Sequence, residues 1–164
     1  MRLIFVCCVV LAAGCGQQIG DSCIVSSDCA IDGSRVCDNS SKDGYCTIAG
    51  CDYDTCPGES ECVRFFSGGF ANRPCGTAAD CSLDELCSIQ SQCVPRSAET
   101  RFCMKKCSQP SDCRDGYECR VYMDPIPMGT NDMLHHGGEP VLAPGEVVNA
   151  STATSFCAPA PATN

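Results

Sequence analysis

The sequence predicts a small disulfide-rich fold of tandem short β-hairpin or loop modules, with little helix outside an N-terminal signal peptide. Nineteen of the 164 residues are cysteine, and a cysteine share above roughly 8–10% in a short exported chain is typical of a disulfide scaffold. The chain has no Trp, and several of its Leu, Ile and Val residues lie within the first eleven positions. Because each native disulfide in such a domain contributes about 2–5 kcal/mol, we expect crosslinks to supply the stability that a small core cannot.

The first fourteen residues have the pattern of a secretory signal peptide. Arg2 gives a positive start, residues 3–11 form an uncharged apolar run, and residues 12–14 are small. Nine residues make a helix about 14 Å long, which is too short to cross a hydrocarbon core of roughly 30 Å. We therefore expect residues 1–14 to be a cleaved leader and not a membrane span.

Residues 11–15, Leu-Ala-Ala-Gly-Cys, resemble the lipobox of bacterial lipoproteins. In that family the cysteine is diacylated and becomes the first residue after cleavage, so the resemblance implies a lipid on Cys15. The match departs from the common pattern at Ala12, where leucine is more typical. Gly16 stands where an Asp would signal inner-membrane retention in some bacteria, so the resemblance implies the outer membrane or cell surface. An ordinary signal peptide with a cysteine near its cleavage site is the alternative.

A count of the cysteines favours lipidation. Cys7 and Cys8 leave with the leader, and a lipid on Cys15 leaves an even number that can pair completely, whereas a free thiol there would leave one unpaired. The sixteen cysteines expected in disulfides are Cys23, Cys29, Cys37, Cys46, Cys51, Cys56, Cys62, Cys75, Cys81, Cys87, Cys93, Cys103, Cys107, Cys113, Cys119 and Cys157.

These cysteines recur in sets with similar spacing. Two sets of four cysteines span 23–46 and 75–93, and a third, partial set spans 107–119. Asp precedes the second cysteine of each set, where a carboxylate can accept backbone hydrogen bonds and fix a turn. Asp-Gly-Tyr also occurs twice, at 43–45 and 115–117. We expect each set to form a short hairpin or loop pair held by two bridges.

The expected organisation has five parts. A lipid-anchored polar tether at 15–22 follows the leader, and cysteine-rich repeats occupy 23–70 and 71–122. A Pro- and Gly-rich loop and tail at 123–164 is tied back to the body by Cys157. The one candidate helical turn outside the leader lies at 81–87, and a weak strand is expected at 146–148.

The cysteine spacing resembles that of extracellular modules. The sets with Asp before the second cysteine resemble the N-terminal cysteine-rich region of the Dickkopf family, and the first set also resembles the start of an EGF-like module. The resemblance covers only the cysteine spacing and the Asp. EGF-like spacing implies first-to-third and second-to-fourth bridges, here Cys23–Cys37, Cys29–Cys46, Cys75–Cys87 and Cys81–Cys93.

Several function classes fit this sequence poorly. The net charge of −9 disfavours nucleic acid and anionic lipid surfaces, although an acidic face could meet a basic partner or calcium. No Cys-x2-Cys occurs, which argues against zinc knuckles and thioredoxin-type redox sites. The only histidines, His135 and His136, fit a surface loop better than a catalytic base. Acids lie close together at 52–54 and 59–61 but lack the ligand sequence of a calcium loop. We therefore expect no catalytic residue, metal or cofactor.

The expected function is a cell-envelope lipoprotein with a non-catalytic binding or structural surface, anchored through its lipid and meeting an envelope or extracellular protein or glycan. Phe65, Phe66 and Phe70 either pack against nearby cystines or form an exposed contact for a partner. The alternatives are a secreted cysteine-rich ligand without lipid, or a hydrolase inhibitor that uses the loop 64–73.

Overall fold

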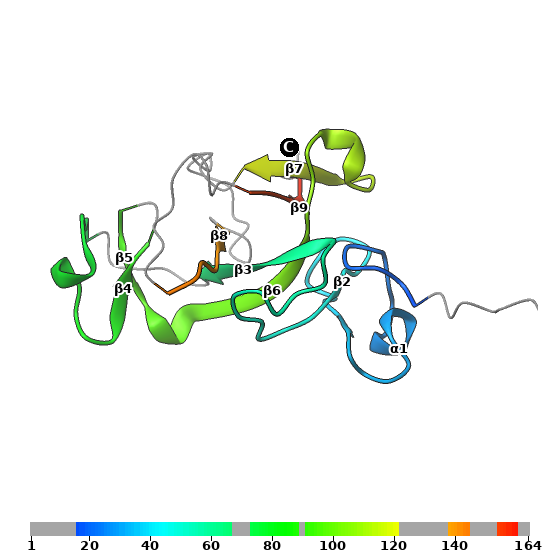
Figure 1. The fold of residues 1–164 in the computed structure, drawn as a ribbon, viewed down its shortest axis with the longest axis horizontal. Coiled ribbons are helices and arrows are strands. Elements are labelled where there is room, and N and C mark those ends of the chain that lie inside the picture. Colours follow the sequence, from blue (N-terminus) through cyan, green and yellow to red (C-terminus); the bar gives the residue numbers. More distant parts are fainter. Residues whose placement is uncertain (1–15, 67–72, 89–90, 122–137, 145–153, 161–164) are drawn as a thin grey trace, which may run out of the picture.

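The computed structural model describes residues 16–66, 73–88, 91–121, 138–144 and 154–160. Cys15, Phe70, both histidines and the expected strand at 146–148 lie outside these ranges. The helical elements are short: α1 (Ser26–Cys29), η1 (Ala78–Asp80), η2 (Arg96–Ala98) and η3 (Pro110–Asp112). The strands are β1 (Val36–Cys37), β2 (Cys46–Thr47), β3 (Ser60–Phe66), β4 (Glu85–Cys87), β5 (Cys93–Pro95), β6 (Glu99–Lys105), β7 (Tyr117–Val121), β8 (Glu139–Pro140) and β9 (Ser155–Pro159). Small antiparallel strand pairs with little helix confirm the predicted fold class (Figure 1).

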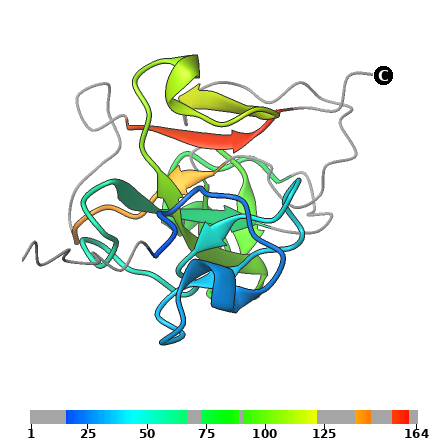
Figure 2. The same ribbon diagram turned by 90° about the vertical axis from the view of Figure 1, so that its right-hand side faces the viewer.

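A three-stranded antiparallel sheet, in the order β6-β3-β8, forms the centre of the molecule. The two-stranded pair β4–β5 lies at one end of it, and α1 with β1–β2 lies at the other (Figure 1). The pair β7–β9 runs beside the central sheet, where Lys106 just after β6 bridges to Phe156 in β9 (Figure 2). The expected boundary at 70 and 71 therefore falls between β3 and β6, which pair along their whole length.

The described cysteines form four units with one connectivity, first-to-third and second-to-fourth. We name each unit by its first cysteine. The Cys23 unit contains Cys23–Cys37 and Cys29–Cys46, and the Cys75 unit contains Cys75–Cys87 and Cys81–Cys93. These are the four pairs that EGF-like spacing implied. The Cys51 unit contains Cys51–Cys62 and Cys56–Cys103, and the Cys107 unit contains Cys107–Cys119 and Cys113–Cys157.

The units share their backbone geometry as well as their connectivity. In each, the third and fourth cysteines stand directly opposite one another on paired strands, as with Cys37 and Cys46 and with Cys62 and Cys103. They do not bond to each other, because each reaches a cysteine on the preceding turn. The two disulfides thus fasten a strand pair to a turn. The Cys75 unit sits inside the Cys51 unit, between its third and fourth cysteines.

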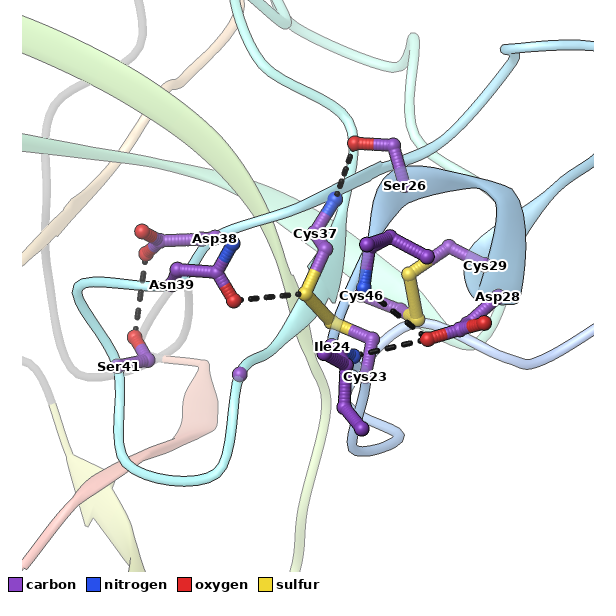
Figure 3. Close-up of a disulfide and its surroundings, with 12 residues drawn as sticks. Cys23, Ile24, Ser26, Asp28, Cys29, Cys37, Asp38, Asn39, Ser41 and Cys46 are labelled. Carbon is purple, nitrogen blue, oxygen red and sulfur yellow. Dashed lines mark hydrogen bonds between the residues drawn. A yellow bond between two sulfur atoms is a disulfide. The ribbon is translucent and has the colours of Figure 1, made fainter.

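The Asp before the second cysteine fixes the turn, as the sequence predicted. The Asp28 carboxylate accepts hydrogen bonds from the backbone N–H groups of Ile24 and Val25, at 2.9 and 3.0 Å (Figure 3). Asp80 and Asp112 make the same pair of contacts in their own units. These backbone hydrogen bonds lower the pKa of all three carboxyls. The helical turn of the Cys75 unit ends at Asp80, so the helix expected over 81–87 is wrong, and β4 occupies part of that segment.

The two Asp-Gly-Tyr segments meet where the Cys23 and Cys107 units touch. The rings of Tyr45 and Tyr117 stack with their centroids 5.4 Å apart. The guanidinium of Arg114 lies over Tyr117, 4.1 Å from its ring centroid, and donates to the backbone carbonyl of Lys42 at 2.9 Å. Gly44 has φ of +65°, and a Cβ there would lie 2.0 Å from the Cys23 carbonyl oxygen, so the turn requires glycine.

The main core is small and draws on distant parts of the chain. Phe65 of β3 meets Phe156 of β9 edge to face, with ring centroids 6.1 Å apart. A Cβ on Gly138 would come within 2.6 Å of the Phe156 ring, so the strand β8 can approach only without a side chain there. Within β8, Glu139 is 2% exposed and pairs with Arg64 of β3 at 2.7 Å.

Residues 17–21 belong to the fold, which corrects the expected polar tether at 15–22. Ile19 is completely buried in the main core. The Gly20 N–H donates to the Cys46 carbonyl oxygen at 2.9 Å, and the Cys46 N–H donates to the Asp21 carbonyl oxygen at 2.9 Å. Ile19 is an apolar residue inside a polar stretch, and its burial draws the neighbouring backbone onto β2.

Candidate binding site

The predicted site residues fall into three groups: the disulfide cysteines, the lipidation site Cys15 and the phenylalanines of the predicted partner contact. All sixteen body cysteines are in disulfides. Within each unit, three cysteine sulfurs lie within 4.8 Å of one another, but a disulfide sulfur is not the thiolate that binds metal. Cys15 lies outside the described residues. The third group is aromatic.

Phe65 and Phe66 do not form an exposed contact. They are 1% and 5% exposed, and Phe66 packs against Leu86 and Val94 of the Cys75 unit. The two side chains point to opposite faces of β3, and both faces are covered, by Phe156 against Phe65 and by Leu86 and Val94 against Phe66. Of the two alternatives for these residues, their burial favours packing and contradicts an exposed partner contact. Arg64, at the start of the expected inhibitor loop, is held by Glu139.

A cavity of about 270 Å³ opens where the turn of the Cys51 unit meets the start of β3. Tyr53 and Pro57 contribute from that turn, and Glu61 from β3. Lys106, Thr154 and residues 140–142 complete the walls from distant parts of the chain. The position of the turn depends on the two disulfides of the Cys51 unit, and on Thr55, whose hydroxyl accepts the Asp52 N–H at 2.8 Å.

Glu61 is the chemically distinctive side chain of this cavity. Its Oε1 atom and the Oγ1 atom of Thr154 are both buried in the wall of the cavity. Burial raises the pKa of Glu61, while a hydrogen bond with the Thr154 side chain and the positive charge of Lys106 oppose that rise. Hydrogen bonds to the charged form stabilise a buried carboxylate, so a ligand that donates a further hydrogen bond to Glu61 would gain from this contact.

Lys106 and Tyr53 add two further kinds of contact. The Lys106 ammonium is exposed enough to donate outward and lies 3.4 Å from the Gly58 carbonyl oxygen. Tyr53 is 48% exposed and lines the same cavity. A carboxylate, a hydroxyl, an ammonium and an aromatic face together can hold a small neutral ligand with many hydroxyl groups.

No protein-family model, curated sequence or solved structure matches this chain. In the part of the chain that the structure describes, no helix has the length and apolar character needed to span a bilayer. The eight disulfides indicate an oxidising, exported environment.

The sequence pointed to the acids around this cavity without separating their roles. Glu59 pairs with Arg35 at 3.7 Å and Asp52 with Arg101 at 3.0 Å, whereas Glu61 faces the cavity. Strand alternation could not separate them, because residues 59 and 61 would share a face in a regular strand, whereas Glu59 precedes β3 and pairs with Arg35. Thr154 carried no such signal, since it lies more than ninety positions away in sequence.

Proposed function

We propose that this chain is a lipid-anchored, non-catalytic binding protein of a bacterial cell envelope, with the cavity around Glu61 as its binding site. One observation carries the anchor: every cysteine that the structure describes is in a disulfide. Complete pairing among the sixteen leaves Cys15 without a disulfide role, and the lipobox-like residues around it supply another role.

Intact mass spectrometry of the mature protein from a bacterial host tests the anchor. We expect residue 15 to be the first residue and to carry the mass of a diacylglyceryl group. The Cys15→Ser variant is the matched control and should lose that mass and its extraction with detergent. A mature chain without acyl mass would contradict the anchor and favour the secreted alternative.

The cavity supports binding of a hydroxyl-rich ligand, of which an envelope or extracellular glycan is the most accessible source. Glu61 and Thr154 provide hydrogen-bonding oxygens, and Tyr53 provides a ring for stacking against a sugar face. Binding is favoured over catalysis because the cysteines of the described residues are held as disulfides and so offer no thiolate nucleophile.

Titration with a panel of monosaccharides and envelope oligosaccharides, followed by NMR shifts of the cavity residues, tests the binding site. The Glu61→Gln variant keeps the shape of the side chain but removes its charge. It should weaken binding by about tenfold or more, because hydrogen bonds to charged groups contribute about 1.5–3 kcal/mol. Glu59→Gln is the control, since that side chain pairs with Arg35. No shift at the cavity with any sugar, or equal affinity for both variants, would contradict this site.

A further inference from the structure

Exposed apolar side chains gather on the Cys23 unit. Six large hydrophobic side chains are exposed among the described residues, and four of them belong to this unit: Ile24, Val25, Ile31 and Val36. Ile31 is 97% exposed and Ile24 is 81% exposed. Along the chain, Ile24 and Val25 precede α1 and Ile31 follows it. Val36 is on β1, which is held to α1 where the Ser26 hydroxyl accepts the Cys37 N–H at 3.1 Å. Grouped exposed apolar side chains mark a contact surface.

The folded chain also begins at this unit. A Cβ built on Gly16 would lie 3.7 Å from the carbonyl oxygen of Cys29, the last residue of α1. The Arg35 guanidinium donates to the Gln17 carbonyl oxygen. Consecutive Cα atoms are about 3.8 Å apart, so position 15 is one peptide bond from a residue that already packs on the Cys23 unit.

We infer that the Cys23 unit rests on the membrane surface, with Ile24, Val25, Ile31 and Val36 in the headgroup region. This inference rests on the proposed lipid at Cys15. The headgroup layer of one leaflet is roughly 5–8 Å thick, and interfacial elements bury their apolar faces about 5–10 Å deep. With no tether between the acyl chains and the fold, the unit next to the anchor meets this layer directly.

The charges of the unit select the kind of lipid. Asp28 and Asp32 are neighbours of the apolar residues and both carboxylates are exposed, whereas Arg35, next to Val36, pairs with Glu59. They would repel an anionic surface. The contact therefore depends on apolar side chains entering a zwitterionic headgroup layer, and it should weaken as anionic lipid is added.

The opposite end of the molecule provides a matched comparison. Leu83 in the Cys75 unit is fully exposed and apolar, like Ile31. The strands β4 and β5 of that unit lie at the end of the molecule away from α1 (Figure 1). A membrane-resting Cys23 unit would hold the Cys75 unit away from the bilayer.

Fluorescence quenching tests the orientation, because the protein contains no Trp and an introduced indole reports alone. Full-length acylated Ile31→Trp and Leu83→Trp proteins would be incorporated separately into phosphatidylcholine vesicles with brominated acyl chains. We expect the indole at position 31 to shift its emission to the blue and lose most of its intensity, and the indole at position 83 to keep both. Adding phosphatidylglycerol should reduce the quenching at position 31.

Intact mass and vesicle flotation on the same samples separate the outcomes. If the protein carries the acyl group and floats with the vesicles, but position 31 is quenched no more than position 83, the inference is overturned and the anchor stands. If the acyl group is absent, the anchor is overturned and this inference falls with it.

Discussion

Loss of the disulfide Cys113–Cys157 should destabilise the protein more than loss of Cys75–Cys87. The first bridge joins residues 44 positions apart and the second joins residues 12 apart. No cysteine lies between 120 and 156, so no other crosslink shortens the longer loop in the unfolded chain. The chain-entropy relation then assigns about 4 kcal/mol to Cys113–Cys157 and about 3 kcal/mol to Cys75–Cys87.

Packing should widen this difference. Cys157 fixes β9, and Phe156 beside it is completely buried against Phe65. Opening the bridge therefore also loosens a contact of the main core. The Cys75 unit instead keeps its strand pair β4–β5 and its second disulfide, Cys81–Cys93, when Cys75–Cys87 is removed.

Urea unfolding of the double variants Cys113→Ala/Cys157→Ala and Cys75→Ala/Cys87→Ala measures both losses. Non-reducing peptide mapping should first establish that the seven other disulfides keep their partners in each variant. We expect a lower unfolding midpoint for the Cys113/Cys157 variant, with a free-energy difference of at least about 1 kcal/mol between the two. An equal or smaller loss for the Cys113/Cys157 variant would refute the reasoning.

Three further perturbations test individual contacts. Gly44→Ala should destabilise the fold severely, because its Cβ would overlap the Cys23 carbonyl oxygen. Gly33→Ala is also at positive φ but has no atom within 4 Å of the added Cβ, so it should cost only about 1 kcal/mol. Urea midpoints of the two variants test this, and equal losses would contradict the overlap. Asp112 has a lowered pKa in the folded state, so its contribution to stability is present above the ordinary pKa of 3.8 and is lost as the pH falls through the folded value. Thermal unfolding from pH 6 downward should therefore show a smaller loss of stability with falling pH for Asp112→Asn than for the unaltered protein. An equal loss would contradict the stabilising role of the Asp112 carboxylate. Glu139→Ala removes the buried partner of Arg64 and should cost about 2–4 kcal/mol. Glu118→Ala removes one member of a more exposed ion pair and should cost about 1 kcal/mol or less. Urea unfolding measures both losses, and comparable values would contradict a structural role for the buried pair.

The sequence revealed local order within each unit more readily than the nesting of units. Evenly spaced cysteines and Asp28 or Asp80 act over a few residues, so the turn and the pairing of those two units could be anticipated. The Cys51 unit was hidden because the Cys75 unit interrupts it and because Thr55 takes the place of the Asp. Only three cysteines of the Cys107 unit are evenly spaced, and the fourth stands 38 positions after Cys119, so spacing alone did not show that it belongs to the unit.

Burial was harder to anticipate than connectivity. Phe65 could be assigned to a core or to a surface until β9 was known to bring Phe156 against it. Ile19 is a single apolar residue in a polar stretch, and only its contact with the core around β2 shows that the stretch is folded. Both outcomes depend on contacts between residues distant in sequence, which neither composition nor spacing encodes.

The candidate site shows the same contrast between local signals and contacts that are distant in sequence. Glu61 was visible as one of several clustered acids, but its role depends on Lys106, just after β6, and on Thr154, just before β9. The Cys51 disulfides that place its turn include the bridge Cys56–Cys103, which spans the whole Cys75 unit. A cavity assembled by long-range crosslinks leaves little trace in local sequence.

The structure of this protein is held mainly by its sulfur–sulfur bonds, and one spectrum tests that directly. A ¹H–¹⁵N correlation spectrum of the mature protein, recorded before and after complete reduction at neutral pH, would show the amide dispersion of each form. We expect the dispersed peaks of the oxidised protein to collapse once the sixteen thiols are free. A reduced protein that keeps its dispersed spectrum would contradict the account.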